Sequence, residues 1–353
     1  MGLNAVILLL ALVPADTAQP YLVAANTMKV QSLPADRVTW LYGNVEITHG
    51  TTVLRGDSAW ASTATDRAVV WGHFRLTDRT AVITGHKAVY TKAAGRAVVH
   101  GDPAARDNSW TMTADSIVFL KALERSYAIG HVALADSSGR NRATGDFGEY
   151  WHDRDYGRLT GRPRFEMAGG DSAGPPAVII ADTMEIEQRG AVATGSGDVQ
   201  YQGDSVWAAG GRLAYDRQRG RIALERAPRV WNATSEIRAR RIDLELEDQA
   251  VRTAWARDSV EMRQTAAATP DTDLICGDSL WAEFAQRKLE RAAVMGRAWS
   301  RYHQLERERA AGRNLAAGDR MDFAFRDGRI ARISVRGGAR GAYRDLPRTG
   351  GAP

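Results

Sequence analysis

Recurring carboxylates are the residues of this chain most able to do chemistry. Asp57, Asp115, Asp182, Asp278 and Asp319 stand at one place in a repeated phrase, with a small residue before the Asp and apolar residues after it. Two carboxylates flanking a sugar bond could hydrolyse it on a β-helical scaffold. That reaction needs one pair at one place, whereas these acids recur in nearly every copy. We interpret them as turn residues or residues at the start of a strand, and predict no catalytic residue and no enzyme.

Histidines offer a second kind of chemistry, because imidazole is a common metal ligand. His73 and His131 occupy equivalent positions in two copies of the repeat, as rungs of a metal ladder would. An outward position beside a repeated glycine is the better interpretation, because the remaining histidines are scattered. Residues 195–198 (Gly-Ser-Gly-Asp) lack the strand–loop–helix setting of a phosphate loop. The sequence predicts no metal and no cofactor.

The elements that position these residues repeat along the chain. Gly43, Gly72, Gly101 and Gly130 stand 29 residues apart. A period of this size is typical of a stack of small supersecondary units that bury their apolar faces together. Two further columns keep the same step: Asp78, Asp107 and Asp136, and Arg67, Arg96 and Arg125.

Each repeat has the pattern of two strands joined by turns. In residues 67–91, Phe74 and Leu76 alternate with His73 and Arg75, and both halves are rich in β-branched and aromatic residues. Helical spacing fits this stretch worse. Roughly ten copies predict roughly twenty strands in an all-β fold. The phrase at 305–313 predicts a short helix or a charged loop between strands.

Two columns of large apolar residues are the candidate binding residues. They could line a groove or could form a plain core, because both environments select the same residue types. The column after each glycine contains Val45, Ile47, Phe74, Leu76, Val132, Leu134, Phe165 and Val199. The column two or four residues past the Asp position contains Tyr90, Ile117, Phe119, Tyr150, Met184, Ile186, Tyr215 and Leu244. Strands are expected to break at Pro103, Pro163 and Pro228, since proline cannot donate to a sheet.

The ends and the charge of the chain predict an exported protein. Residues 1–18 have the apolar run and small residues of a secretory signal, followed by one continuous repeat array over 19–343 and a disordered tail over 344–353. The net charge is +5, and the arginines alternate with acids, which predicts a solvated outer sheet face and no nucleic-acid partner. A sharper alternative is that arginines at a groove rim contact anionic lipid head groups. Cys276 is expected to act as a small buried hydrophobe, because it is the single cysteine.

With these residues in view, the chain resembles the OstA-like (organic-solvent-tolerance-like) family of periplasmic lipopolysaccharide-transport bridges, also called LptA-like. The resemblance covers most of residues 23–343 and rests on the recurrence of short phrases. These are G-N-V-E-I, G-H-F-R-L-T-D, G-H-V-A-L-A-D, T-A-D-S-I-V-F, I-A-D-T-M-E-I and G-G-R-L-A-Y.

The resemblance implies a β-jellyroll of stacked antiparallel strands in two facing sheets, with an open apolar groove. It implies a non-catalytic periplasmic carrier that shields lipopolysaccharide acyl chains on the way to the outer membrane. The implied partners are lipopolysaccharide, an inner-membrane extraction complex and an outer-membrane translocon, with possible end-to-end self-association. Two alternatives stay open: an exported structural or adhesive β-repeat protein, and the periplasmic part of an outer-membrane lipopolysaccharide translocon.

Overall fold

A computed structural model gives the fold of the protein. It describes residues 22–78, 81–167, 176–187, 192–203, 206–216, 218–247, 250–265, 272–285, 288–306, 309–326 and 329–345. The predicted signal segment, residues 1–18, lies outside the described residues. The chain divides into two compact units, residues 1–167 with 183–190 (unit 1) and residues 168–182 with 191–353 (unit 2). Each unit is described by itself.

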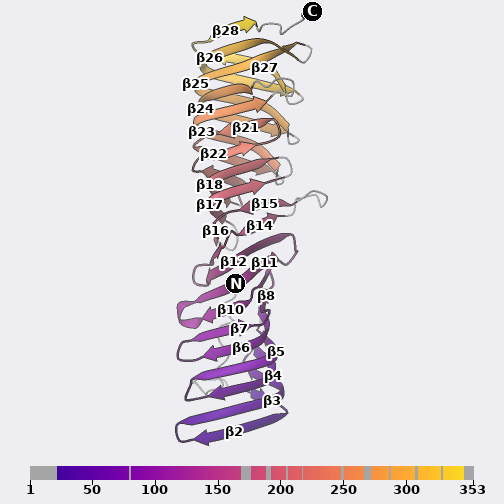
Figure 1. Ribbon diagram of the computed structural model, residues 1–353, viewed down its shortest axis with the longest axis vertical. Helices are drawn as coiled ribbons and strands as arrows, with labels where there is room; N and C mark the ends of the chain where they lie inside the picture. The colour runs from indigo at the N-terminus through magenta and orange to yellow at the C-terminus, as the bar shows by residue number, and fades with distance from the viewer. Residues whose placement is uncertain are drawn as a thin grey trace, which may run out of the picture. The chain divides into compact units, whose positions relative to one another are not determined.

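Unit 1 consists of antiparallel ribbons that pair in chain order (Figure 1). One short 3-10 helix, η1 (Lys121–Leu123), interrupts the strands. The strands of unit 1 are β1 (Leu22–Ala24), β2 (Thr27–Leu33), β3 (Asp36–His49), β4 (Thr52–Ser62), β5 (Arg67–Thr77), β6 (Ala81–Thr91), β7 (Arg96–His100), β8 (Ala104–Asp107), β9 (Trp110–Thr113), β10 (Ser116–Leu120), β11 (Arg125–Asp136), β12 (Asn141–Trp151), β13 (Tyr156–Thr160), β14 (Arg164–Met167) and β16 (Thr183–Glu187).

Alternate ribbons of unit 1 turn a corner at the repeated glycine. Gly72 has a φ of +74° and His73 a φ of +48°, a left-handed pair that costs glycine little. The register between β4 and β5 shifts here, between Arg55/Arg75 and Ser58/Trp71. A Cβ on Gly72 would overlap the carboxylate of Asp57 on the next ribbon. The glycine and Asp columns of the sequence are therefore the two sides of one corner.

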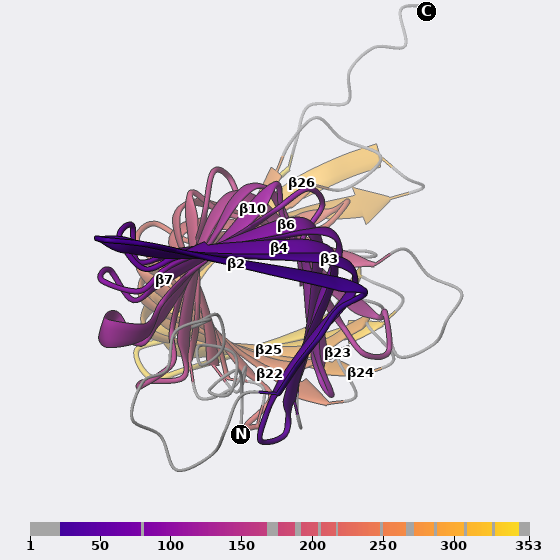
Figure 2. The same cartoon turned by 90° about the horizontal axis from the view of Figure 1, so that it is seen from below.

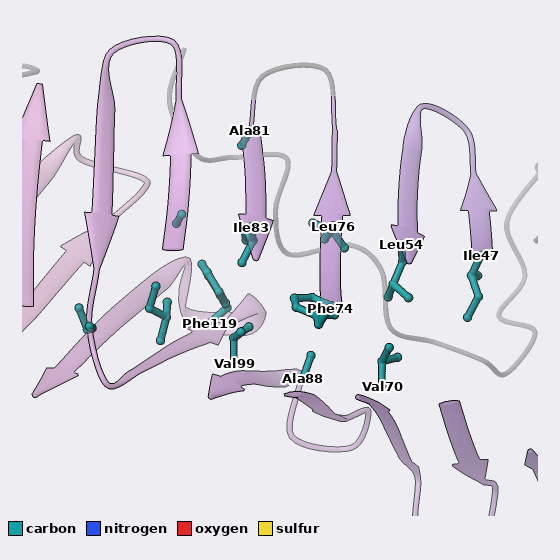
Figure 3. Packing of buried hydrophobic residues seen from close by; sticks show 14 of the residues in the cluster. Ile47, Leu54, Val70, Phe74, Leu76, Ala81, Ile83, Ala88, Val99 and Phe119 are labelled. Carbon is teal, nitrogen blue, oxygen red and sulfur yellow. The ribbon is translucent and has the colours of Figure 1, made fainter. Parts of the chain in front are cut away.

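The corner folds each ribbon into two opposed walls. In β3, β5 and β11 the residues before the corner pair in a first wall and those after it in a second wall, and in β4, β6 and β12 the order along the chain is reversed. Figure 3 shows Val70, Ala88 and Val99 on one wall pointing towards Leu76 and Ile83 on the other. Viewed along the stack, successive ribbons of unit 1 overlie one another with a progressive twist (Figure 2). The twist is the ordinary consequence of right-handed strands.

Unit 2 repeats this construction. Its corners include Gly197–Asp198, Gly296–Arg297 and Gly337–Gly338, all with positive φ. The strands of unit 2 are β15 (Ala177–Ile180), β17 (Val192–Gln202), β18 (Trp207–Asp216), β19 (Arg221–Glu225), β20 (Arg229–Trp231), β21 (Ser235–Arg238), β22 (Arg241–Glu247), β23 (Ala250–Thr265), β24 (Thr272–Ala285), β25 (Lys288–Glu306), β26 (Arg309–Arg326), β27 (Arg329–Arg336) and β28 (Arg340–Asp345).

The all-β prediction is confirmed, with one local correction. The three predicted proline breaks are confirmed, because Pro103, Pro163 and Pro228 each lie in a gap between two strands and the second strand begins at the next residue. The helix or charged loop predicted over 305–313 is wrong. β25 ends at Glu306 and β26 begins at Arg309, so strand residues occupy this stretch on both sides of residues 307–308, which lie outside the described part of the chain. β28 ends at Asp345, two residues into the predicted tail. Within the described part of the chain, no helix has the length and hydropathy to cross a membrane.

Candidate lipid-binding interior

The first wall of unit 1 carries an unbroken row of inward side chains. Each member of the row pairs directly with the next one across neighbouring strands, and most members are buried. The row is Leu41, Ala59, Val70, Ala88, Val99, Ile117, Ala128, Gly148, Leu159 and Met184.

The second wall presents a matching row on the far side of the corner. Its members also pair one to the next and belong to, or pack against, the same hydrophobic cluster as the first row. The row is Ile47, Leu54, Leu76, Ile83, Ala105, Met112, Leu134, Ala143 and Phe165. Unit 1 therefore has two apolar rows that face each other across the interior.

The candidate residues of unit 1 lie on these opposed walls. Those of the glycine column lie on the second wall and those of the Asp column on the first. Phe119 is 2% exposed, and the residues nearest the corner are packed as tightly. The buried candidates in the whole chain are Val45, Ile47, Phe74, Leu76, Ile117, Phe119, Val132, Met184, Val199 and Leu244. The half-buried ones are Tyr90, Leu134, Tyr150, Phe165, Ile186 and Tyr215.

Sequence reasoning missed the small residues of the first wall. Leu41, Val70, Val99 and Ala128 each stand two positions before a corner glycine and keep the 29-residue step. Their role could not be recognised, because a leucine, valine or alanine two positions before a glycine is common in any strand. The period itself was the signal that could have found them.

Unit 2 has its own pair of inward rows. Val199 and Tyr215 lie in this unit, Val199 past the corner of β17 and Tyr215 in β18. Burial raises the pKa of Tyr201, which lies in the second-wall row. The first-wall row is Gly195, Leu213, Leu224, Ile242, Ala256, Leu280, Val294, Met321 and Val335. The second-wall row is Ile179, Tyr201, Ala208, Val230, Ile237, Met262, Ile275, Ser300 and Ala316.

One polar pair interrupts the apolar interior of unit 1. Ser126 Oγ lies 2.6 Å from His152 Nε2, and both side chains are buried. Burial lowers the pKa of His152, against the smaller opposing effect of Asp153 and Asp155. The imidazole is therefore neutral at pH 7. The pair closes the wall between β11 and the end of β12.

The recurring acids and histidines act at the corners. His73 Nδ1 lies 2.9 Å from Asp57 Oδ2, and His131 Nδ1 lies 2.9 Å from Asp115 Oδ2. Both imidazoles are almost fully exposed. The hydrogen bond to Asp115 raises the pKa of His131. The corner thus explains why the acids recur, because Asp57 and Asp115 each bind the residue that follows the corner glycine of the neighbouring ribbon.

The single cysteine is an inert part of unit 2. The Cys276 side chain is half-buried, and desolvation, helped by the charge of Glu261, raises the pKa of its thiol to about 11. A thiol with that pKa stays protonated at neutral pH and is a poor nucleophile.

Ribbons folded at a corner into two facing apolar walls form a repeat-type β-jellyroll. Residues 22–125 match the family model described as LptA/(LptD N-terminal domain) LPS transport protein. This segment is an OstA-like lipopolysaccharide-transport domain, as the sequence resemblance predicted, and the family is a transport family, not an enzyme family.

The chain was also compared with solved structures and with curated proteins. The crystal structure of LptH from Pseudomonas aeruginosa, described as the LptA homologous periplasmic component of the conserved lipopolysaccharide transport device, aligns at 17% identity. The alignment covers 48% of this chain and 98% of LptH, with a TM-score of 0.21, which is too low to support a conclusion. No curated protein matches the chain.

Proposed function

We propose that the chain is a non-catalytic periplasmic carrier that shields lipopolysaccharide acyl chains between its two walls. The observation that carries the proposal is the pair of facing apolar rows in unit 1, each continuous from strand to strand. The ten residues of the first-wall row span roughly 43 Å at the usual strand spacing. The transport family of residues 22–125 supports the same class of cargo.

The physical need for such a surface follows from the cargo. An acyl chain exposed to water loses about 0.8 kcal/mol for each CH₂ group that could have been buried. A carrier that crosses an aqueous compartment must therefore offer apolar contact along its whole length. The half-buried residues Tyr90, Leu134 and Phe165 are the ones with side-chain surface left to contact a chain.

A single charge on the inner face tests this function. Tyr90→Asp places a carboxylate among apolar inward side chains, and we expect lipopolysaccharide loading of the purified protein to fall about tenfold or more. Thr91→Asp is the matched control, because Thr91 faces outward on the same strand between Arg67 and Arg96. Loading that is unchanged in a folded Tyr90→Asp protein would contradict the proposal.

The N-terminal edge of unit 1 fits end-to-end assembly with another module. Met28 continues the first-wall row beyond Leu41, and Val23 continues the second-wall row beyond Ile47. Met28 is 52% exposed and Val23 is 36% exposed, so both rows end in uncovered apolar side chains. An edge strand with such a face is a template for strand addition.

A substitution at this edge separates assembly from loading. Met28→Glu is expected to weaken association with a second copy or with a partner module, whereas Gln31→Glu, on the outer face of the same strand, leaves it unchanged. Sedimentation velocity over a range of concentrations measures the effect. The same geometry would serve the periplasmic part of an outer-membrane translocon, which remains the alternative.

A further inference from the structure

The first wall of unit 1 has a second face whose chemistry the carrier function does not use. Successive side chains of a strand point to opposite faces. Val70, Ala88 and Val99 point into the interior (Figure 3), so their neighbours Val69, Val89 and Val98 point away from it. We call the outward-facing residues of the first-wall segments of β3, β4, β5, β6, β7, β10 and β11 the outer face.

The centre of the outer face is an apolar row. Its members pair directly across seven strands and are buried or half-buried. The row is Trp40, Trp60, Val69, Val89, Val98, Val118 and Tyr127. Apolar side chains therefore occupy both faces of this wall.

The row on the corner side adds large exposed residues. Tyr42 is 40% exposed, Trp71 is 36% exposed and Ile129 is 43% exposed. They align with one another across the strands, because Tyr42 pairs with Ser58, Ser58 with Trp71, and Ser116 with Ile129. Ser58, Lys87, His100 and Ser116 lie between them in this row, so the exposed apolar side chains alternate here with polar and basic ones.

Apart from Asp36 at the start of β3, whose carboxylate accepts hydrogen bonds from the hydroxyls of Ser62 and Thr63, the charged residues of the outer face are basic. Arg67, Arg96 and Arg125 stand on alternate strands of the row on the turn side, roughly 10 Å apart, and Lys87 stands beside Trp71. The three rows contain no carboxylate. Among the described residues, Arg67, Lys87 and Arg96 have no ion-pair partner, while Arg125 lies over the ring of Trp151.

The acids nearest to the outer face sit at its margins. Asp66 and Glu124 lie in the turns at one side, where the backbone N–H of Lys92 donates to the carbonyl of Asp66 and that of Glu124 donates to the carbonyl of Lys121. At the other side, the corner carboxylate of Asp115 is bound by His131. The face itself is thus apolar and cationic.

The equivalent face of unit 2 is different. Arg212 contacts Glu225 at 3.1 Å, Arg241 contacts Glu225 and Asp243 at 2.8 Å each, and Arg257 lies 3.9 Å from Asp243. These cations are already matched within their own face. Glu225 and Asp243 are equally engaged, so these carboxylates of a second copy are not free to bind the outer face of unit 1.

We propose that the outer face of unit 1 docks on the surface of an anionic phospholipid bilayer. Trp and Tyr side chains prefer the membrane–water interface, and arginine binds phosphate through two parallel hydrogen bonds. Basic residues beside an apolar strip add electrostatic attraction to anionic leaflets. This docking does not depend on the proposed carrier function, because it uses side chains that face away from the interior.

Vesicle binding of the full chain tests the proposal. Co-sedimentation is measured with vesicles of phosphatidylglycerol and phosphatidylcholine, and with phosphatidylcholine alone. We expect binding to the anionic vesicles only. The variant Arg67→Gln, Lys87→Gln, Arg96→Gln should lose about 100-fold in partitioning, the effect expected for three basic residues at a charged surface.

The matched control removes the same charge from unit 2. Arg212→Gln, Arg241→Gln, Arg257→Gln should bind within about twofold of the unchanged protein, since those arginines are engaged with acids. Far-UV circular dichroism checks that both variants are folded, and Trp71→Ser, a smaller change, should weaken binding several-fold. Equal loss in the two triple variants, equal binding to neutral vesicles, or no binding at all would overturn the proposal. So would a loss of self-association in the unit 1 triple variant, which would assign the face to a protein contact.

Discussion

The inner rows of the two units are alike, whereas their outer faces differ. Leu41 and Val70 in unit 1 correspond to Leu213 and Leu280 in unit 2 as buried members of the first wall. Outside, unit 1 presents tryptophan, valine and unmatched cations, and unit 2 presents arginines matched with acids. The apolar interior is therefore the feature that both units share, while the pattern of charged and aromatic residues on the outer face differs from one unit to the other.

The corners show the same contrast on a smaller scale. In unit 1, Gly43, Gly72, Gly101, Gly130 and Gly161 have positive φ, and each is followed by Asn, His, Asp or Arg with positive φ as well. In unit 2 two corners have no glycine, at Arg226–Ala227 and Asp258–Ser259, although their φ values are positive. Positive φ thus occurs at these corners with or without the glycine that makes it inexpensive.

The largest effect is expected from emptying an inner row. Leu280→Ala removes a side chain that is fully buried in unit 2, and we expect the free energy of unfolding to fall by about 2–5 kcal/mol. Ser279→Ala, on the outer face of the same strand, should change it by less than about 0.5 kcal/mol. Urea unfolding followed by circular dichroism measures both. Similar losses in the two variants would remove the distinction between inner and outer rows.

A smaller effect separates the two kinds of corner. Gly130 has a φ of +73°, and a Cβ there would meet the Asp115 carboxylate, so Gly130→Ala should cost about 1–3 kcal/mol of stability. Ala227 has a φ of +58°, and Ala227→Gly should stabilise unit 2 by up to about 1 kcal/mol. Thermal unfolding compares the variants. If both changes destabilise the protein, the corners are not equivalent.

Acidification should affect a corner histidine and a wall histidine in opposite directions. The pKa of His131 is raised by its hydrogen bond to Asp115, so its contribution is complete below the unfolded pKa of about 6.5 and is lost as the pH rises through the folded value. The pKa of His152 is lowered by burial. The unfolded chain therefore binds that proton more tightly, and stability is lost as the pH falls through 6.5 towards the folded value.

Replacing each histidine isolates these terms. We expect His152→Gln to reduce the loss of stability between pH 7 and pH 5, and His131→Gln to increase it. The urea midpoint measured at pH 5, 6 and 7 gives the slopes. Slopes that change in the same direction for both variants would contradict the assignment of one group to the solvent-exposed corner and the other to the wall.

The smallest effect is expected on the outer face of unit 2. Asp243→Asn removes one member of an exposed ion-pair network and should cost no more than about 1 kcal/mol. Added salt should reduce the difference between the variant and the unchanged protein. A cost as large as that of Leu280→Ala would mean that the outer face, too, carries the stability of the unit.

Much of the fold could be predicted from the sequence because the period fixes the corners. The glycine that recurs every 29 residues marks the corner, and the recurring acid marks the residue that packs against it from the neighbouring ribbon, as Gly72 and Asp57 show. The predicted count of roughly twenty strands agrees with the structure when strands divided at a corner, such as β7 and β8, are taken as one ribbon.

The rest could not be predicted because adjacent apolar residues hide the direction of each side chain. Val69 and Val70 are both buried, yet one faces outward and the other inward. Sequence alternation therefore did not reveal the outer face, and the arginine column at Arg67 and Arg96 was read as ordinary solvated charge. Only the corner, which sets the register of each ribbon, assigns these residues to a face.

Site-specific crosslinking on β10 tests the central claim most directly. A photoreactive residue at Phe119 points into the interior, and one at Leu120 points outward from the same strand. Under illumination in living cells, the account predicts a crosslink to lipopolysaccharide from position 119 and none from position 120. Crosslinks of equal strength from both positions, or only within the protein from position 119, would contradict it.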